Sequence, residues 1–327
     1  MFKQAVGFSI VLILLALVGL LLLPSPDVIL SVSARSESVE YVVRDRTAAG
    51  IQMTNVQYIA GDSDPFSPAP EPVCLTARLL PAPGSKIRYL VNSDGEIGID
   101  FNMSEQADTV GILEVQGQKA IKLTRRSQLL FSEKSNECNG EVPDVLPVWG
   151  FGSIGKVRTF NNSLEPEPGE LVDGEVRITA KAIKRIWGIF PGAEGLYDAG
   201  IVALPTGGKL SNMEREDQAP WLGSARYSQS NGIPVFHINV STESNTLWLY
   251  RSGLKQDSEP DPIGASAFVI QTRDPGIIRL QVILALMLII VQTVVTIFQT
   301  PGAPLLSILK RHNENETKEV KDTDEKT

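Results

Sequence analysis

Residues 277–298 read IIRLQVILALMLIIVQTVVTIF, and Arg279 is the only charged residue among them. At 1.5 Å per residue, an α-helix of this length crosses roughly 30 Å, the thickness of the hydrocarbon core of a bilayer. A helix is also the one single-segment structure that satisfies its own backbone hydrogen bonds in lipid. The stretch therefore predicts a transmembrane helix over residues 276–299, with a large domain before it and a short tail after it.

A second apolar run, Ala5–Leu23, follows a Met-Phe-Lys start. Two interpretations fit it: a signal peptide cleaved after Ala34, or an uncleaved signal-anchor that forms a transmembrane helix over residues 1–24. The run is long for a signal peptide, and the small residues before Ala34 lie far beyond its apolar core. We favour the retained helix.

The orientation of the two helices is predicted from their flanking charges. Lys3 and the Lys310-Arg311 pair favour cytoplasmic ends, whereas Arg273 and Arg279 lie on the opposite flank. Because an apolar segment at the start of a chain acts as an export signal, we expect residues 25–275 to be extracytoplasmic, periplasmic or extracellular. Residues 300–327 then form a short cytoplasmic tail, mostly disordered because it is polar and highly charged. The membrane is expected to be a plasma or inner membrane.

The residues between the two apolar runs are predicted to be β-strands almost throughout. Several short segments are rich in β-branched residues and alternate apolar with polar positions, which is typical of strands with one face on a core. These segments are Ser36–Arg44, Lys86–Asn92, Val110–Val115, Lys119–Arg125, Glu175–Ala182, Ile233–Val240 and Thr246–Arg251. Asp94-Gly95 and Gln116-Gly117 separate neighbouring segments as tight hairpin turns do.

Strands this short and this numerous, in a chain with 21 prolines and 27 glycines, predict an antiparallel β-sandwich or barrel-like domain. A boundary between two subdomains fits residues 132–147, where polar residues and two prolines interrupt the strands. Residues 183–190 are compatible with one short helix, which Pro191 and Gly192 would end.

The two cysteines of the chain, Cys74 and Cys138, both fall in the exported part. Two thiols in an oxidising compartment predict a disulfide bond. The alternative is that Cys74, in the apolar segment VCLTARLL, is simply buried and reduced.

Two polar residues within the second apolar run, Gln281 and Gln292, are candidates for association within the membrane. Eleven residues make about three helical turns, so both fall near one face of the helix. An amide in hydrocarbon favours a partner that carries polar groups. We expect Gln292 to pair with another copy of the chain or with a different membrane protein.

No catalytic, cofactor-binding or metal-binding site stands out from the sequence. Gly150–Gly155 has the Gly-x-Gly-x-x-Gly letters of a dinucleotide-binding turn, but no β-α-β pattern surrounds it, so glycines at a bend or bulge of a sheet explain it better. His237 is the one histidine of the central domain, which leaves too few ligands for zinc, and half-exposed strand histidine is its simplest interpretation.

The charge of the central domain argues against a nucleic-acid partner. Residues 25–275 carry about nine more acidic than basic residues, and nucleic-acid binding favours a basic face. We therefore expect a non-enzymatic membrane protein whose β domain binds a protein or envelope polymer or scaffolds a membrane assembly. Its partners would be the lipid bilayer and another membrane or envelope protein, or further copies of itself. The alternative is a membrane-anchored envelope hydrolase that uses paired carboxylates on a polysaccharide.

Overall fold

The fold is taken from a computed structural model, which describes residues 27–61, 73–91, 95–103, 109–124, 127–131, 138, 140–156, 169–186, 190–213, 219–230, 233–251, 260–264 and 273–299. The predicted N-terminal helix (1–24) and the tail after Gln299 lie outside these residues. The described chain divides into two compact units. A β unit contains residues of 26–181 and 195–271, and a helical unit contains residues of 182–194 together with the segment from Arg273 to Gln299.

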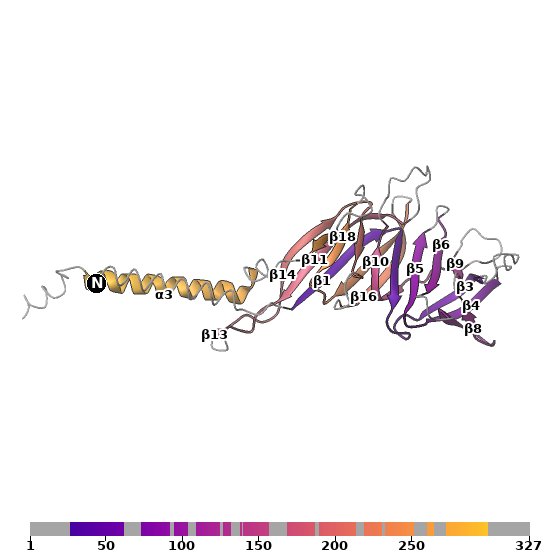
Figure 1. Cartoon of the computed structure of the whole chain (residues 1–327), viewed down its shortest axis with the longest axis horizontal. Helices are drawn as coiled ribbons and strands as arrows, with labels where there is room; N and C mark the ends of the chain where they lie inside the picture. The colour runs from indigo at the N-terminus through magenta and orange to yellow at the C-terminus, as the bar shows by residue number, and fades with distance from the viewer. Residues whose placement is uncertain are drawn as a thin grey trace, which may run out of the picture. The chain divides into compact units, whose positions relative to one another are not determined.

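The described part of the chain is mainly β, as the alternating segments predict, and every strand pairing is antiparallel (Figure 1). The strands of the β unit are β1 (Val28–Ser36), β2 (Ser38–Val43), β3 (Ile51–Ile59), β4 (Val73–Pro81), β5 (Ser85–Val91), β6 (Ile97–Met103), β7 (Gly111–Val115), β8 (Ile121–Leu123), β9 (Gln128–Phe131), β10 (Leu146–Ile154), β11 (Leu171–Lys181), β14 (Leu196–Leu204), β15 (Lys209–Ser211), β16 (Trp221–Ser230), β17 (Ile233–Thr242), β18 (Leu247–Tyr250) and β19 (Asp261–Ile263).

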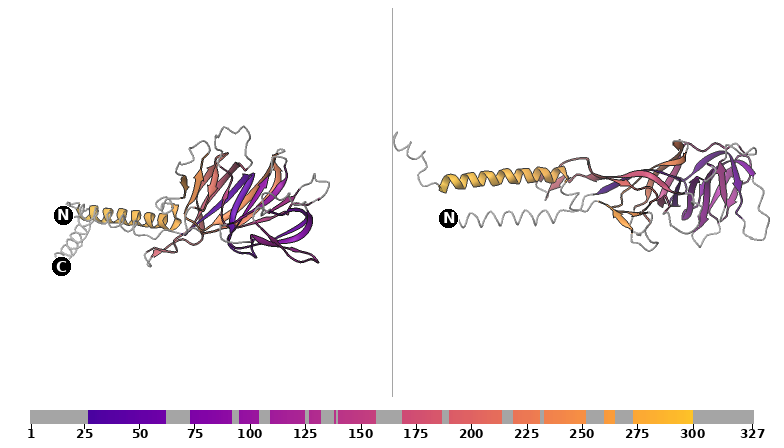
Figure 2. Two further views of the ribbon diagram at one scale, coloured as in Figure 1. Left: turned by 45° about the vertical axis from the view of Figure 1, so that its right-hand side comes forward. Right: turned by 90° about the horizontal axis from the view of Figure 1, so that it is seen from above.

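These strands form one continuous hydrogen-bonded network, in which three series of strands join at β10. From β10 the network runs in one direction through β16, β17, β1 and β11 to β14. In the other direction it runs through β2, β5, β6, β9, β3, β4 and β7 to β8. The last residues of β10 also pair with β15, which continues to β18 and β19. Figure 2 shows these strands from two further directions.

Alternation along each strand sends one set of side chains into a shared core. In β1, for example, Val28, Leu30, Val32 and Ala34 are buried while the residues between them are partly or fully exposed. The core cluster draws on strands from both directions of the network. Its largest fully buried side chains are Trp221, Tyr41, Tyr89, Phe101 and Phe236.

The glycine-rich motif covers the last residues of β10, where it pairs with β2, and Gly155 follows the strand directly, as its interpretation as a sheet feature predicts. A Cβ on Gly152 would lie 2.2 Å from the Glu40 carbonyl oxygen, so only glycine lets the two backbones come this close. Gly152 N–H also donates to Asn212 Oδ1 at 2.7 Å. The motif therefore serves close packing of strands.

Both predicted hairpins are present as antiparallel pairs. β5 pairs with β6, and β7 with β8. Gly95 and Gly117 have φ angles of +80° and +73°, values that glycine adopts without strain. Residues 92–94 lie outside the described part of the chain. The subdomain boundary near residues 132–147 stays a prediction.

The helical unit contains α3 (Pro275–Gln299) and a short hairpin of β12 (Arg185–Ile186) and β13 (Phe190–Pro191). The expectation of a helix over residues 183–190 is wrong. Gly192 N–H donates to the Lys184 carbonyl at 2.7 Å, which closes the chain into a hairpin rather than a helical turn.

The helix α3 coincides with the predicted span of residues 276–299. By length and composition its residues Pro275–Thr293 could cross a membrane, and among the described residues it is the one helix that could. Large apolar side chains from Ile278 to Val291 are exposed along it.

Candidate binding face

The exposed face of four adjacent strands, β11, β1, β17 and β16, carries a regular array of polar side chains, here called the polar face. Strand register sets it, because residues paired across neighbouring strands share a face. Three cross-strand rows result, each read from β11 through β1 and β17 to β16. They are Asp173–Arg35–His237–Arg226, Glu175–Ser33–Asn239–Ser224 and Arg177–Ser31–Ser241–Leu222.

A hollow of about 510 Å³ lies over the second and third rows. Its floor is made of the small side chains on β1 and β17, namely Ser31, Ser33, Asn239 and Ser241. The longer Glu175 and Arg177 stand on the β11 side, and Leu222 stands on the β16 side. Short residues between longer ones thus leave a trough along two central strands, lined by hydroxyl, amide and charged groups.

The first row is organised by an ion pair. The Arg35 guanidinium holds the Asp173 carboxylate in two contacts, Nε to Oδ1 at 2.7 Å and Nη2 to Oδ2. The hydrogen bond and the charge of Asp173 raise the pKa of Arg35. The hydrogen bond from Arg35 lowers the pKa of Asp173, to which the charges of Arg35 and His237 also contribute.

The Arg35–Asp173 pair orients its two side chains more than it stabilises the fold. Both partners of the Arg35–Asp173 pair are partly exposed, and in the second pair Arg177 Nη2 lies 3.6 Å from Glu175 Oε1. Surface pairs of this kind contribute about 0–1 kcal/mol, because water and salt screen them. Held by its two contacts to Asp173, Arg35 has a defined orientation on the polar face, whereas Arg177 makes only the longer contact to Glu175.

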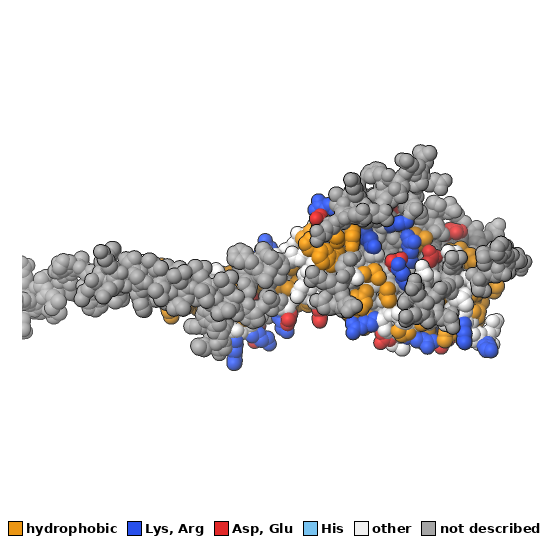
Figure 3. All heavy atoms as spheres, viewed as in Figure 1, with side chains coloured by type: hydrophobic (Ala, Val, Ile, Leu, Met, Phe, Trp, Pro, Cys, Tyr) orange, Lys and Arg blue, Asp and Glu red, His pale blue; other side chains and the backbone are white. Residues whose placement is uncertain are grey.

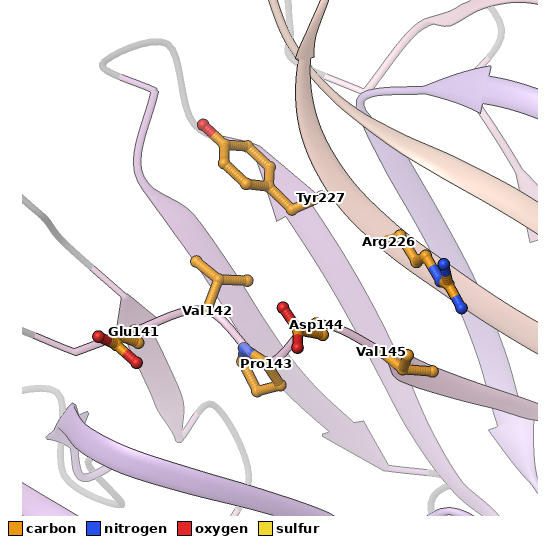
Figure 4. Close-up of a pocket in the computed structure, with 7 residues that line it drawn as sticks. All are labelled: Glu141, Val142, Pro143, Asp144, Val145, Arg226 and Tyr227. Carbon is orange, nitrogen blue, oxygen red and sulfur yellow. The ribbon is translucent and has the colours of Figure 1, made fainter.

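A second hollow, of about 650 Å³, lies beside the segment from Glu141 to Val145 and the β16 residues Arg226 and Tyr227 (Figure 4). It contains the two carboxylates Glu141 and Asp144. Figure 4 shows that Glu141 extends away from Asp144 and does not converge on it. Glycoside hydrolysis needs two carboxyl groups facing one bond, so this arrangement does not support the predicted alternative of a hydrolase.

The cysteines and the histidine considered in the sequence analysis lie apart from one another in the structure. Cys74, on β4, and Cys138 lie at disulfide distance, with their Cα atoms 5.6 Å apart. His237 is half-buried on β17, with Phe236 and Ile238 buried on either side of it, as the alternation predicts. Within the described residues there is no group of three or more His, Cys, Asp or Glu side chains that could hold a metal ion.

The two glutamines lie exposed on α3. The nearby threonines are satisfied within the helix itself: Thr293 Oγ1 donates to the Ile289 carbonyl and Thr296 Oγ1 to the Gln292 carbonyl, each at 2.8 Å. Each hydroxyl therefore donates its proton within the helix.

The array of the polar face escaped the sequence reasoning. Arg35, Asp173 and Arg226 lie on strands far apart in sequence, and only the pairing register brings them into one row. The alternation of Val28–Ser36 (VILSVSARS) does mark Ser31, Ser33 and Arg35 as one outward set. That signal was available, although it does not reveal which strands lie beside it.

Comparisons of the chain with protein-family models, with curated proteins and with solved structures found no match.

Proposed function

We propose that the chain is a membrane-anchored, non-enzymatic protein whose extracytoplasmic β domain binds another envelope protein through its polar face. The observation that carries this proposal is the trough on β1 and β17. It is an open surface with charged side chains along one side rather than a deep pocket around convergent acids.

The composition around the trough favours a protein as the partner. Leu222 and Ile201 are exposed, each by 52 %. Leu222 stands on the β16 side, and Ile201 is paired with Arg177 on the other side. Apolar side chains beside an arginine are typical of protein–protein interfaces, which are enriched in Arg.

Filling the trough tests the proposal. Ser33 is exposed on its floor, so Ser33→Trp should block a partner without disturbing the core. Gln52→Trp, at an exposed position of β3, is the matched control. Each variant is purified from its own membranes in mild detergent, and the co-purified proteins are compared. We expect loss of a specific partner from Ser33→Trp alone. Equal recovery of the same partners from all three proteins would refute the polar face as the binding surface, and a retained polysaccharide would identify a polymer instead.

The membrane arrangement is part of the same proposal. Two helices, at residues 1–24 and 276–299, would hold residues 25–275 outside the cytoplasm as one sandwich-like domain. In support, β10 pairs on one side with both β16 and β15, which would let it belong to two layers. An alkaline-phosphatase fusion after Arg273 should be active and one after Thr327 inactive. The reverse pattern would place the domain in the cytoplasm.

A further inference from the structure

The start of α3 is fixed to the β12–β13 hairpin by one buried carboxylate. Asp274 is fully buried, and its Oδ1 accepts a hydrogen bond from Gly276 N–H at 2.7 Å. Its Oδ2 accepts another from Ile183 N–H at 2.9 Å. Ile183 in turn packs against the cluster of Ile277 and Leu280. The hairpin and the first turns of the helix therefore form one junction.

Close backbone packing adds to this junction. A Cβ on Gly276 would lie 3.1 Å from Ala193 N and 3.2 Å from the Ile183 carbonyl oxygen. A larger residue would push the returning arm of the hairpin away from the helix. The position of the hairpin beside the helix start is thus defined by both hydrogen bonds and packing.

Four exposed bases lie among the described residues of this unit: Lys184, Arg185, Arg273 and Arg279. Lys184 and Arg185 on the hairpin, together with Arg279 on the first turns of the helix, are here called the basic collar. The acids among the described residues of this unit are Asp274, which is buried in the cap, and Glu194. In Figure 3, Lys and Arg side chains gather over the hairpin. The collar is therefore a net cationic surface at one end of the apolar helix.

The basic collar lies at the end of the apolar part of α3, where a membrane-spanning helix would pass from hydrocarbon into the headgroup region. Exposed apolar side chains continue from Ile278 along the helix, so Arg279 lies where hydrocarbon would give way to headgroups. In sequence, Lys184 and Arg185 precede Ile-Trp-Gly-Ile-Phe at residues 186–190, a composition typical of membrane–water interfaces. Bases at this depth lie within reach of lipid phosphates.

We propose that the basic collar binds the headgroups of anionic phospholipids where α3 enters the membrane. This inference rests on the proposed membrane span. In the predicted orientation the collar lies on the extracytoplasmic side, where the positive-inside rule expects few basic residues. Headgroup binding gives these bases a physical role there. Each Lys or Arg near an anionic lipid surface strengthens binding roughly fivefold, so the three bases together account for about 100-fold.

The test uses the full-length protein in detergent, mixed with equal amounts of phosphatidylglycerol and phosphatidylcholine, with retained lipid measured by native mass spectrometry. The variant is Lys184→Gln, Arg185→Gln and Arg279→Gln together. The control is Arg78→Gln, Lys119→Gln and Lys122→Gln together, which removes the same charge from exposed positions of the β unit. We expect the natural protein and the control to prefer phosphatidylglycerol, and the collar variant to lose that preference by about 100-fold.

Two outcomes would overturn the inference: a collar variant that keeps the preference, or a control that loses it equally. Extraction of cell membranes with alkaline carbonate separates this failure from failure of the membrane span. If the natural protein stays in the membrane but the collar variant binds phosphatidylglycerol unchanged, only the headgroup site is wrong. If the natural protein is extracted, the proposed span itself is wrong.

Discussion

Two buried tyrosines offer a sharp test of how β2, β5 and β10 meet. Tyr41 and Tyr89 are both fully buried, and their hydroxyl oxygens lie 2.7 Å apart. The Tyr89 hydroxyl donates to the Pro147 carbonyl oxygen, also at 2.7 Å. Because that carbonyl can only accept, the Tyr41 hydroxyl must donate to Tyr89. The three groups form a directed chain.

The direction of this chain predicts unequal costs for two similar substitutions. Tyr41→Phe removes the first donor and leaves the bond from Tyr89 to Pro147 intact, which should lower the free energy of unfolding by about 1 kcal/mol. Tyr89→Phe leaves both the Tyr41 hydroxyl and the Pro147 carbonyl without this partner. With roughly 1–3 kcal/mol for each buried unsatisfied group, the cost should be about 3 kcal/mol.

The double variant makes the prediction stricter. In the Tyr89→Phe background, replacing Tyr41 by Phe removes a stranded donor, so it should restore about 1 kcal/mol rather than cost more. Urea unfolding of the full-length protein in detergent, followed by tryptophan fluorescence, measures all four free energies. The reasoning is refuted if Tyr41→Phe costs as much as Tyr89→Phe, or if the double variant is less stable than Tyr89→Phe alone.

The pH dependence of stability, the cysteine pair and Gln292 each give a further prediction. Burial raises the pKa of both Tyr41 and Tyr89 in the folded protein, so their contribution to stability is full below about pH 10, where unfolded tyrosine ionises, and is lost as the pH rises further. Above that pH, the free energy of unfolding of the natural protein should fall by about 2.7 kcal/mol per pH unit more than that of the Tyr41→Phe, Tyr89→Phe double variant. If the two proteins lose stability in parallel as the pH rises, the hydroxyls are not buried as described. If Cys74 and Cys138, 64 positions apart, are bridged, the native protein should resist thiol alkylation and reduction should lower the free energy of unfolding by about 4 kcal/mol. Quantitative alkylation without prior reduction would exclude the bridge. Finally, Gln292→Leu should weaken oligomers or co-purified membrane complexes while Val291→Leu does not, and unchanged complexes would show that the amide has no such role.

The strand segments could be recognised from sequence wherever one face meets the core. Alternation in Lys86–Asn92 and Ile233–Val240 predicted β5 and β17, and the turn at Asp94-Gly95 predicted β6 as the antiparallel neighbour of β5. The same reasoning failed at residues 183–190. There the local pattern allowed a helix, and the hairpin is instead held by Asp274, about ninety positions away in the chain.

The sequence by itself determined two features of the protein. One is an apolar stretch long enough to cross a bilayer, and the other is a large part rich in short amphipathic strands. These properties are local, since helix length and side-chain alternation are set by neighbouring residues. Only the tertiary structure decided which strands pair, that Arg35 lies between Asp173 and His237, and that Cys74 lies near Cys138. Strand pairing and these side-chain positions depend on the register between strands and on packing in the shared core. Register and core packing are both set by contacts between residues far apart in the chain.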